Sequence, residues 1–251
     1  MRKPFQGVWN IVRFNWPFYA IGTGLIITIL LLRGYANLPF RILTDLAFVL
    51  IVVPTIISLM VSFYVYDLSG LYKLEWLNGL QQNAGEKIVN INAGFDETSV
   101  LLKNKFKDAE MIVCDFYDPS KHTEPSIKRA RKAYPPYPNT LQISTTDLPF
   151  TDDSADKIFV MFSAHEIRNL GERKAFFTEL HKIISPSGRI VVVEHLRDAV
   201  NYAAYNIGAL HFYSRSTWLD SFRTARLTVD SEIKITPFIT AFFLSKHGTE
   251  S

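Results

Sequence analysis

The stretch TTDLPFTDDSADKIFVMFSAHEI at residues 145–167, followed by FFTELHKIISPSGRIVVVEH at residues 176–195, decides the fold. It holds a short β-branched apolar run, a helical stripe of apolar residues, a Pro-Ser-Gly turn and a second apolar run. A helix placed between two buried strands is the crossover that a parallel pair of strands requires. The stretch therefore predicts an α/β protein with a parallel sheet.

Further runs of the same kind surround this stretch. We expect strands at residues 87–91, 110–114, 140–144, 157–162 and 189–194, and a helix at 172–184. Two last runs, 226–235 and 238–246, are separated only by Thr236 and Pro237, so they must form an antiparallel hairpin. The prediction is a doubly wound, Rossmann-like, seven-stranded sheet over residues 85–251 that ends in an antiparallel hairpin.

The N-terminal part differs in composition, because it contains two long apolar runs. Residues 14–32 and 46–66 contain no charged residue, and each run is long enough to cross a bilayer as a helix. We expect a transmembrane hairpin with helices at about 14–33 and 43–66, so that residues 1–66 form a membrane anchor. Two buried helices of a soluble core, or a cleaved signal peptide, are weaker alternatives, because the runs lack a polar face and no cleavage site follows the first.

Residues 67–84 join the two parts. Their leucines and aromatic residues predict an interfacial linker helix, which either rests on the membrane surface or packs on the domain as its first helix. The N-terminal flank has three basic residues and the loop between the two apolar runs has two, which favours a cytoplasmic N-terminus. An even number of crossings then predicts an integral membrane protein with its large domain facing the cytoplasm.

The charge balance excludes one class of partner. Residues 67–251 carry 22 Lys and Arg against 23 Asp and Glu, so the large domain is nearly neutral and nucleic acid is not an expected partner. A basic cluster at 128–132 is either a solvated helix face or a contact with anionic headgroups. The single Cys114 excludes an internal disulfide and a cysteine-based zinc site, and we assign no residue as a metal ligand.

Polar residues at the strand ends mark the expected site. In an open parallel sheet the ligand lies at the carboxyl ends of the strands. Asp115 ends the second strand, where a carboxylate can accept both hydroxyls of a ribose. Asp147 ends the third and can accept from an exocyclic amine, with Leu148 offering apolar contact. Ser163 follows the fourth strand, and Asn90, Asn92 and Gly94 form the first loop.

These motifs resemble the later motifs of class I S-adenosylmethionine-dependent methyltransferases, closest in style to the small-molecule and lipid-modifying branch. The DA-x-x-LPF-x-D-x-S-FD region of that family matches residues 147–156, its helix, Pro-Gly turn and fifth strand match 179–193, and the terminal hairpin is shared. The resemblance covers residues 75–246. It implies S-adenosylmethionine as cofactor, with Asp115 binding the ribose and Asp147 the adenine.

The first loop departs from the family pattern of an acid followed by three alternating glycines. Asn90, Asn92, Gly94 and Asp96 stand at these positions, so only the middle glycine is present. Asn tolerates the left-handed backbone better than other non-glycine residues, and Asp96 or the following Glu97 can supply the missing charge. The departure leaves one alternative, in which the chain is a catalytically decayed methyltransferase fold that acts as a membrane binding or scaffold protein. A nicotinamide oxidoreductase would need G-x-G-x-x-G, which is absent.

Methyl transfer from a sulfonium needs alignment, exclusion of water and, for some acceptors, a base. His195 is our first candidate and His165 our second for the general base, while His211 would orient the acceptor from a helix or lid at 201–215. Any one of these histidines is more often structural than catalytic. The anchor favours a lipidic or amphiphilic acceptor, such as a headgroup or a quinone-like ring.

Overall fold

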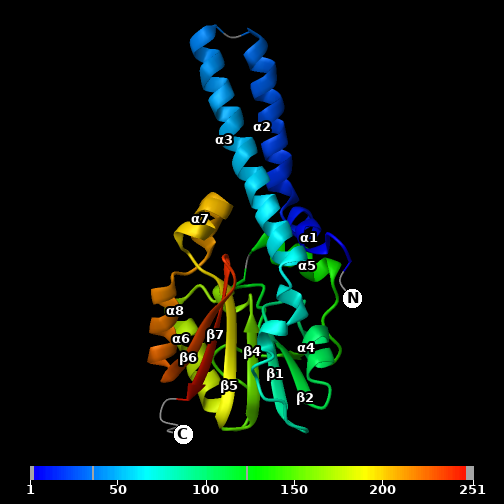
Figure 1. The fold of residues 1–251 in the computed structure, drawn as a ribbon, viewed down its shortest axis with the longest axis vertical. Coiled ribbons are helices and arrows are strands. Elements are labelled where there is room, and N and C mark those ends of the chain that lie inside the picture. The colour runs from blue at the N-terminus through cyan, green and yellow to red at the C-terminus, as the bar shows by residue number, and fades with distance from the viewer. Residues whose placement is uncertain (1–2, 36, 123, 247–251) are drawn as a thin grey trace.

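The structure is a computed structural model that describes residues 3–35, 37–122 and 124–246. A long two-helix hairpin rises from one end of an α/β domain (Figure 1). The sheet of that domain has the strand order β3-β2-β1-β4-β5-β7-β6, with β7 antiparallel to both of its neighbours and the other pairs parallel. Its strands are β1 Lys87–Asn92, β2 Glu110–Asp115, β3 Leu141–Gln142, β4 Ala155–Met161, β5 Ile184–His195, β6 Leu227–Thr236 and β7 Ile239–Lys246.

This order confirms the predicted Rossmann-like sheet and its terminal antiparallel hairpin. The central strands are apolar in both directions, as strands buried on two faces must be. Along β5, Ile190 and Val192 join one core cluster, while Val191 and Val193 join the cluster on the opposite face. The alternation follows from the two-residue period of a strand.

Helices cover both faces of the sheet. The helices α6 (Leu170–Ile183) and α8 (Arg215–Thr224) bury four large aromatic side chains on the first face: Phe176, Phe177, Trp218 and Phe222. The second face is covered by α4 (Ser99–Lys105) and by the linker. The helix predicted at 172–184 is confirmed as α6. It starts two residues earlier, where the Asn169 side chain accepts a hydrogen bond from the Glu172 amide at 2.9 Å.

The linker is a series of short turns rather than one helix. It forms η1 (Tyr64–Leu68), η2 (Leu71–Lys73) and η3 (Glu75–Leu77). Gly70 and Leu74 adopt left-handed backbone angles, φ 76° and 57°, which interrupt any longer helix. Leu71, Leu74 and Leu77 are completely or almost completely buried against the second face. Of the two expectations for this segment, packing on the domain is the one that the structure shows.

The hairpin consists of α2 (Trp16–Tyr35) and α3 (Leu38–Phe63). Both helices are long and apolar enough to cross a membrane, and almost none of their residues is buried in the isolated chain. A helix of a soluble core would bury its apolar face. These two helices therefore lie outside the domain core, close to the bounds predicted from the sequence.

A short helix precedes the hairpin and packs back on the domain. Helix α1 (Gln6–Phe14) contacts α3, η1 and α5 (Pro125–Ala133). The carboxylate of Asp67 accepts hydrogen bonds from the amides of Gly7 and Val8, both at 2.8 Å, which satisfies two unpaired donors at the start of α1. Gly7 is required at this crossing, since a Cβ there would lie 2.4 Å from the Tyr66 Cβ atom. Residues grouped with the anchor in the sequence thus form part of the domain surface.

Candidate active site

The carboxyl ends of β1, β2 and β4 form the expected ligand edge of the sheet. The chain runs from β1 outward to β2 and β3 and then returns to β4 on the other side of β1. Strands β1 and β4 are therefore where the topology switches direction, and a crevice opens at such a point. Gly94 and Ser163, predicted for the cofactor, lie in the loops after these strands, and Asn90 and Asn92 lie at the end of β1.

The loop after β1 is held by its own side chains. The Asn92 side chain accepts from the Gly94 amide at 3.0 Å, and Gly94 has φ 91°, a backbone conformation that favours glycine. The Asn90 amide nitrogen donates to the hydroxyls of Thr98 and Ser99 at 3.0 and 2.8 Å. The side-chain oxygen of Asn90 is buried and accepts no hydrogen bond from the described residues.

The two acids that follow have separate roles. The Asp96 carboxylate accepts from the amides of Thr98 and Ser99 at 2.9 Å, so it caps the start of α4. The Glu97 carboxylate accepts from the Tyr72 hydroxyl at 2.8 Å and the Asn10 amide at 3.4 Å, and it lines a cavity. Of these two acids, Glu97 is the one placed to offer negative charge to a ligand in the cavity.

Asp115 lies at the tip of β2, as predicted, but a cation from the chain holds it. Its carboxylate is 3% exposed and accepts from the Arg131 guanidinium at 2.5 Å and from the Tyr117 amide at 2.8 Å. Arg131 comes from α5 and stacks over the Tyr117 ring at 4.5 Å. A Cβ at Gly94 would lie 2.8 Å from the same guanidinium. Arg131 therefore fills the space between the glycine turn and the carboxylate.

The other predicted cofactor residues are dispersed. Asp147 is exposed, whereas Leu148 is 2% exposed and lies in the core. The Leu148 amide donates to the Glu179 carboxylate at 3.1 Å. The Ser163 hydroxyl donates to the Ile91 carbonyl oxygen at 2.9 Å and ties the end of β4 to β1. Their roles in cofactor binding stay predictions.

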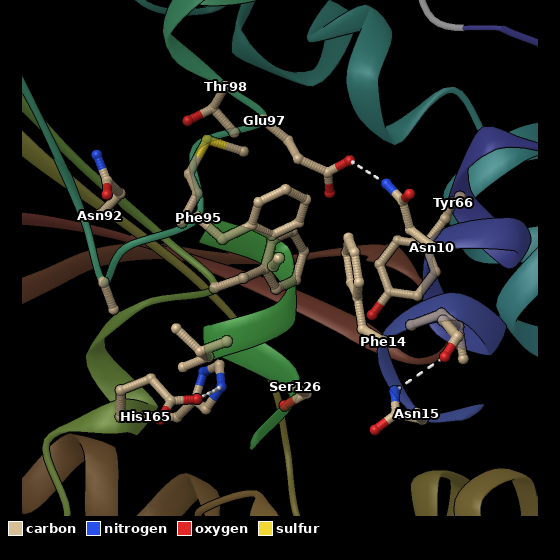
Figure 2. A pocket seen from close by; sticks show the side chains of 18 of the residues that line it. Asn10, Phe14, Asn15, Tyr66, Asn92, Phe95, Glu97, Thr98, Ser126 and His165 are labelled. Carbon is tan, nitrogen blue, oxygen red and sulfur yellow. Dashed lines mark hydrogen bonds and ion pairs between the residues drawn. The ribbon is translucent and has the colours of Figure 1, made fainter. Parts of the chain in front are cut away.

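A cavity of about 250 Å³ opens between α1, α5 and the ends of β1 and β4. Figure 2 shows Phe14 and Asn10 of α1 facing Phe95 and Glu97 of the β1 loop across it, with His165 at one end. The Phe14 ring makes edge contacts with the rings of Phe95 and Tyr134. Helix α1 therefore forms one wall of the site, a role that the sequence analysis missed because the segment was assigned to the anchor.

The structure brings His165 and His211, two of the predicted candidates, together at the cavity. The His165 Nδ1 atom lies 2.7 Å from Glu194 and its Nε2 atom 3.1 Å from Glu166. The His211 Nε2 atom lies 3.5 Å from the same Glu166 oxygen. Burial alone would lower the pKa of His165, but Glu194 and Glu166 outweigh it and raise the pKa to about 10. His165 therefore carries a proton at neutral pH.

His195 lies next to this group with both ring nitrogens engaged. Its Nδ1 atom donates to the Asn201 side chain at 3.2 Å, and its Nε2 atom accepts from the Tyr66 hydroxyl at 2.7 Å. The Asn201 amide nitrogen donates to Asp198 and to the Phe238 carbonyl oxygen, which fixes its orientation. Burial lowers the pKa of His195 to about 4. His195 is neutral and reaches the cavity through Tyr66, which lines it.

The residues at this edge fit an adenosyl cofactor on one condition. Gly94 leaves space for a close approach, and Asp115 is a buried carboxylate at the strand tip. A sugar can reach that carboxylate only when Arg131 leaves it. The Arg131 side chain is 35% exposed, so solvent is available to receive it.

Comparison with known proteins adds independent information. The model of the ubiE/COQ5 methyltransferase family matches residues 56–215. A demethylmenaquinone methyltransferase of Clavibacter sepedonicus is 32% identical over 111 residues, 44% of this chain and 42% of that protein. One of Thermus thermophilus is 26% identical over 113 residues, 45% of this chain and 49% of that protein. The chain therefore spans less than half the length of these curated relatives.

Solved structures support the fold. A SAM-dependent methyltransferase from Aquifex aeolicus superposes with a TM-score of 0.54 at 15% identity, over 76% of this chain and 97% of that one. Geranyl diphosphate C-methyltransferase from Streptomyces coelicolor, solved with S-adenosyl-L-homocysteine, superposes with a TM-score of 0.52 at 11% identity, over 74% and 82%. At such identities the likeness concerns the fold alone.

Proposed function

We propose that this chain, which belongs to the ubiE/COQ5 methyltransferase family, transfers a methyl group from S-adenosylmethionine to a ring carbon of a membrane-resident hydroxylated quinol. The family membership confirms the predicted methyltransferase family and supports the predicted activity and cofactor. The names of the relatives, demethylmenaquinone methyltransferase and ubiquinone/menaquinone biosynthesis C-methyltransferase, support a quinol as the acceptor.

The position of the cavity carries this proposal. It is walled by α1 at the foot of the apolar hairpin, and its rings include Phe14, Phe95 and Phe162. Exposed aromatic residues surround that foot, among them Trp9 at 62% and Trp16 at 56% exposure. Trp at such a place is typical of a membrane–water interface. An acceptor held in the bilayer would thus meet the cavity where the hairpin leaves the membrane.

The proposal includes the membrane. Helices α2 and α3 have the length and composition of spanning helices, and their exposed apolar surface has no cover in the described chain. We place both helices across the bilayer, with the domain on the cytoplasmic side. Helix α7 (Ala199–Tyr205) and η5 (Asn206–His211) lie beside the hairpin foot, where the exposed Ile207 and Leu210 would enter the interface (Figure 1).

The side chains of the cavity suit the chemistry of a phenol. S-adenosylmethionine supplies a methyl group bonded to a positively charged sulfur. Positive charge at His165 would stabilise the acceptor oxygen as a phenolate after the hydroxyl proton has left to solvent, and the phenolate makes the adjacent ring carbon nucleophilic toward the methyl group. The ring carbon must then lose a proton to regain aromaticity. We propose that the Tyr66 hydroxyl passes this proton to the neutral His195, which keeps His195 as the base predicted from the sequence.

The direct test uses the full chain in lipid vesicles with methyl-labelled S-adenosylmethionine and a reduced, prenylated naphthoquinol that lacks the ring methyl group. We expect a labelled product one methylene heavier by mass spectrometry, and none with the variant Asp115→Ala. Label in the phospholipid headgroups, or in neither lipid while the cofactor still binds, would contradict a quinol acceptor.

One observation favours a second candidate, a decayed fold that binds lipid without transferring methyl groups. It is the pairing of Asp115 with Arg131, which occupies the place expected for the ribose. Calorimetric titration with S-adenosylhomocysteine separates the two functions. The enzyme requires saturable binding, and a chain that takes up no nucleoside at all would be a binding protein.

A further inference from the structure

The histidines at the end of the cavity share a geometric pattern. Each points its Nε2 atom at one oxygen of Glu166, His165 at 3.1 Å and His211 at 3.5 Å. Each also points its Nδ1 atom at another carboxylate, that of Glu194 at 2.7 Å for His165 and that of Glu124 at 3.4 Å for His211. The two imidazoles thus converge on one carboxylate, and each has an outer carboxylate behind it.

The spacing is that of a metal ligand set. One ligand atom from each of His165, Glu166 and His211 lies within 4.8 Å of the other two. Ligands at about 2.0–2.1 Å from a tetrahedral zinc ion are separated by about 3.3 Å. The two measured separations from Glu166 lie on either side of this value. A histidine that ligates metal through one nitrogen and donates from the other to a carboxylate is the usual arrangement of such sites.

The charges around the two histidines and their access to the cavity also suit a metal ion. Glu166 and Glu194 are buried carboxylates, with 7% and 1% of their side chains exposed, and buried charges need compensation. The guanidinium of Arg168 supplies part of that compensation: its Nη2 atom lies against both ring nitrogens of His211, and Nη1 donates to the His211 carbonyl oxygen at 2.7 Å. Arg168 is exposed and has solvent to move into. All three candidate ligands line the cavity, so a coordination position would face the acceptor.

We propose that His165, Glu166 and His211 bind a divalent transition-metal ion of the zinc type, with Glu194 and Glu124 orienting the two histidines. Two imidazoles and one carboxylate suit zinc and its neighbours and not magnesium, which prefers oxygen ligands. On the proposed function, the metal would take the acceptor hydroxyl as its next ligand and lower the pKa of that hydroxyl. The metal site itself does not depend on that function.

The test is a calorimetric titration of the full chain, purified in detergent without a histidine tag and stripped with a chelator, first with Zn²⁺ and then with Mg²⁺. We expect one Zn²⁺ per chain and no saturable Mg²⁺ binding. His211→Ala should weaken Zn²⁺ binding at least about 100-fold, and Glu194→Gln about 10–100-fold, the range for loss of an outer carboxylate. His181→Ala, on the outer surface of α6, is the matched control and should bind as the wild type does.

Two further measurements check the Zn²⁺ titration. Co²⁺ should give the intense visible absorption of a four-coordinate site with the wild type and His181→Ala and not with His211→Ala. S-adenosylhomocysteine titrated into the same samples reports on the cofactor site, so failure of the proposed function and failure of the metal site are distinguished. No stoichiometric Zn²⁺ binding, or binding equal in His211→Ala and His181→Ala, would overturn the proposal.

Discussion

Arg131 reaches from α5 to the tip of β2 and takes the carboxylate of Asp115 that a ribose would need. The Arg131 side chain is 35% exposed and that of Asp115 only 5%, so water screens the ion pair from the Arg131 side alone. A cofactor ribose would have to compete with Arg131 for the same carboxylate oxygens. Under the proposed function, Arg131 would thus limit how tightly the site binds a nucleoside.

Replacing Arg131 with alanine should therefore tighten the binding of S-adenosylhomocysteine. We expect an effect of up to about tenfold, which corresponds to about 1.4 kcal/mol for one screened, charge-assisted bond. Calorimetry of the wild type and Arg131→Ala measures it, and Lys128→Ala, an exposed residue of the same helix, is the control. Equal or weaker binding by Arg131→Ala would show that the guanidinium does not stand in the way of the cofactor.

The Tyr66 hydroxyl should matter for turnover and not for cofactor binding. Tyr66→Phe removes the hydrogen bond to His195 and, with it, the proposed route of the proton. We expect kcat to fall about 10²–10⁴-fold, with cofactor affinity unchanged. Tyr72→Phe, which lines the same cavity but bonds Glu97, should keep the rate within a few-fold. Equal losses in both variants would assign Tyr66 a packing role.

Single residues show where the sequence was informative. Asp115 could be placed at a strand tip because an apolar run must end where a parallel strand does. The occupation of that tip by Arg131 could not be predicted, since a basic residue in a charged helical segment is typical of a solvated face. The histidine cluster was predicted as a group, but its convergence on Glu166 depends on the exact ends of η4 (Ala164–Glu166) and η5.

At the scale of elements, α1 is the part that connects the hairpin with the site. Asp67 holds its first turn, Phe14 packs on the β1 loop, and the Tyr134 hydroxyl at the end of α5 donates to Asn10 at 2.9 Å. Helix α5 in turn carries Arg131. A movement of the hairpin foot would therefore reach both walls of the cavity.

Asp67→Asn should loosen α1 without unfolding the domain. A carboxylate that accepts two amides at a helix start contributes about 0.5–2 kcal/mol. We expect hydrogen exchange of the α1 amides to quicken by about 2- to 30-fold, the range that corresponds to this free energy, while the β4 and β5 amides stay protected. Asp108→Asn, exposed on the domain surface, should leave α1 unchanged. Protection of α1 equal to that of the wild type would contradict the role assigned to Asp67.

Elements were predicted well where their pattern is local. The strands, α6 and the two long apolar helices follow from periodicity and length. Helix α1 was missed because its residues were assigned to the anchor, although the amphipathic pattern of Gln6–Phe14 is typical of a surface helix. The linker was expected as a helix because its leucines suit one. The left-handed angles at Gly70 and Leu74 that break it are set by packing on the sheet.

For the whole molecule, the proposed membrane-spanning hairpin requires the domain and the turn of the hairpin to lie on opposite sides of the membrane. Tyr35, at the end of α2, is 94% exposed, and Lys107 is exposed on the domain. In sealed vesicles whose cytoplasmic face points outward, a thiol reagent that does not cross membranes should label Lys107→Cys and not Tyr35→Cys. The native Cys114 is buried and serves as the unlabelled background. Labelling of both positions without lysis would contradict a spanning hairpin.

The account as a whole depends on the carboxylate of Asp115 as the ligand of the cofactor ribose. The measurement is a calorimetric titration of the full chain in detergent with S-adenosylhomocysteine, for the wild type and Asp115→Asn, with circular dichroism showing that both are folded. Asn keeps the shape and loses the charge, so we predict saturable binding by the wild type and at least about 100-fold weaker binding by the variant, as expected for two charge-assisted hydrogen bonds. Equal affinity of the two proteins would contradict the account.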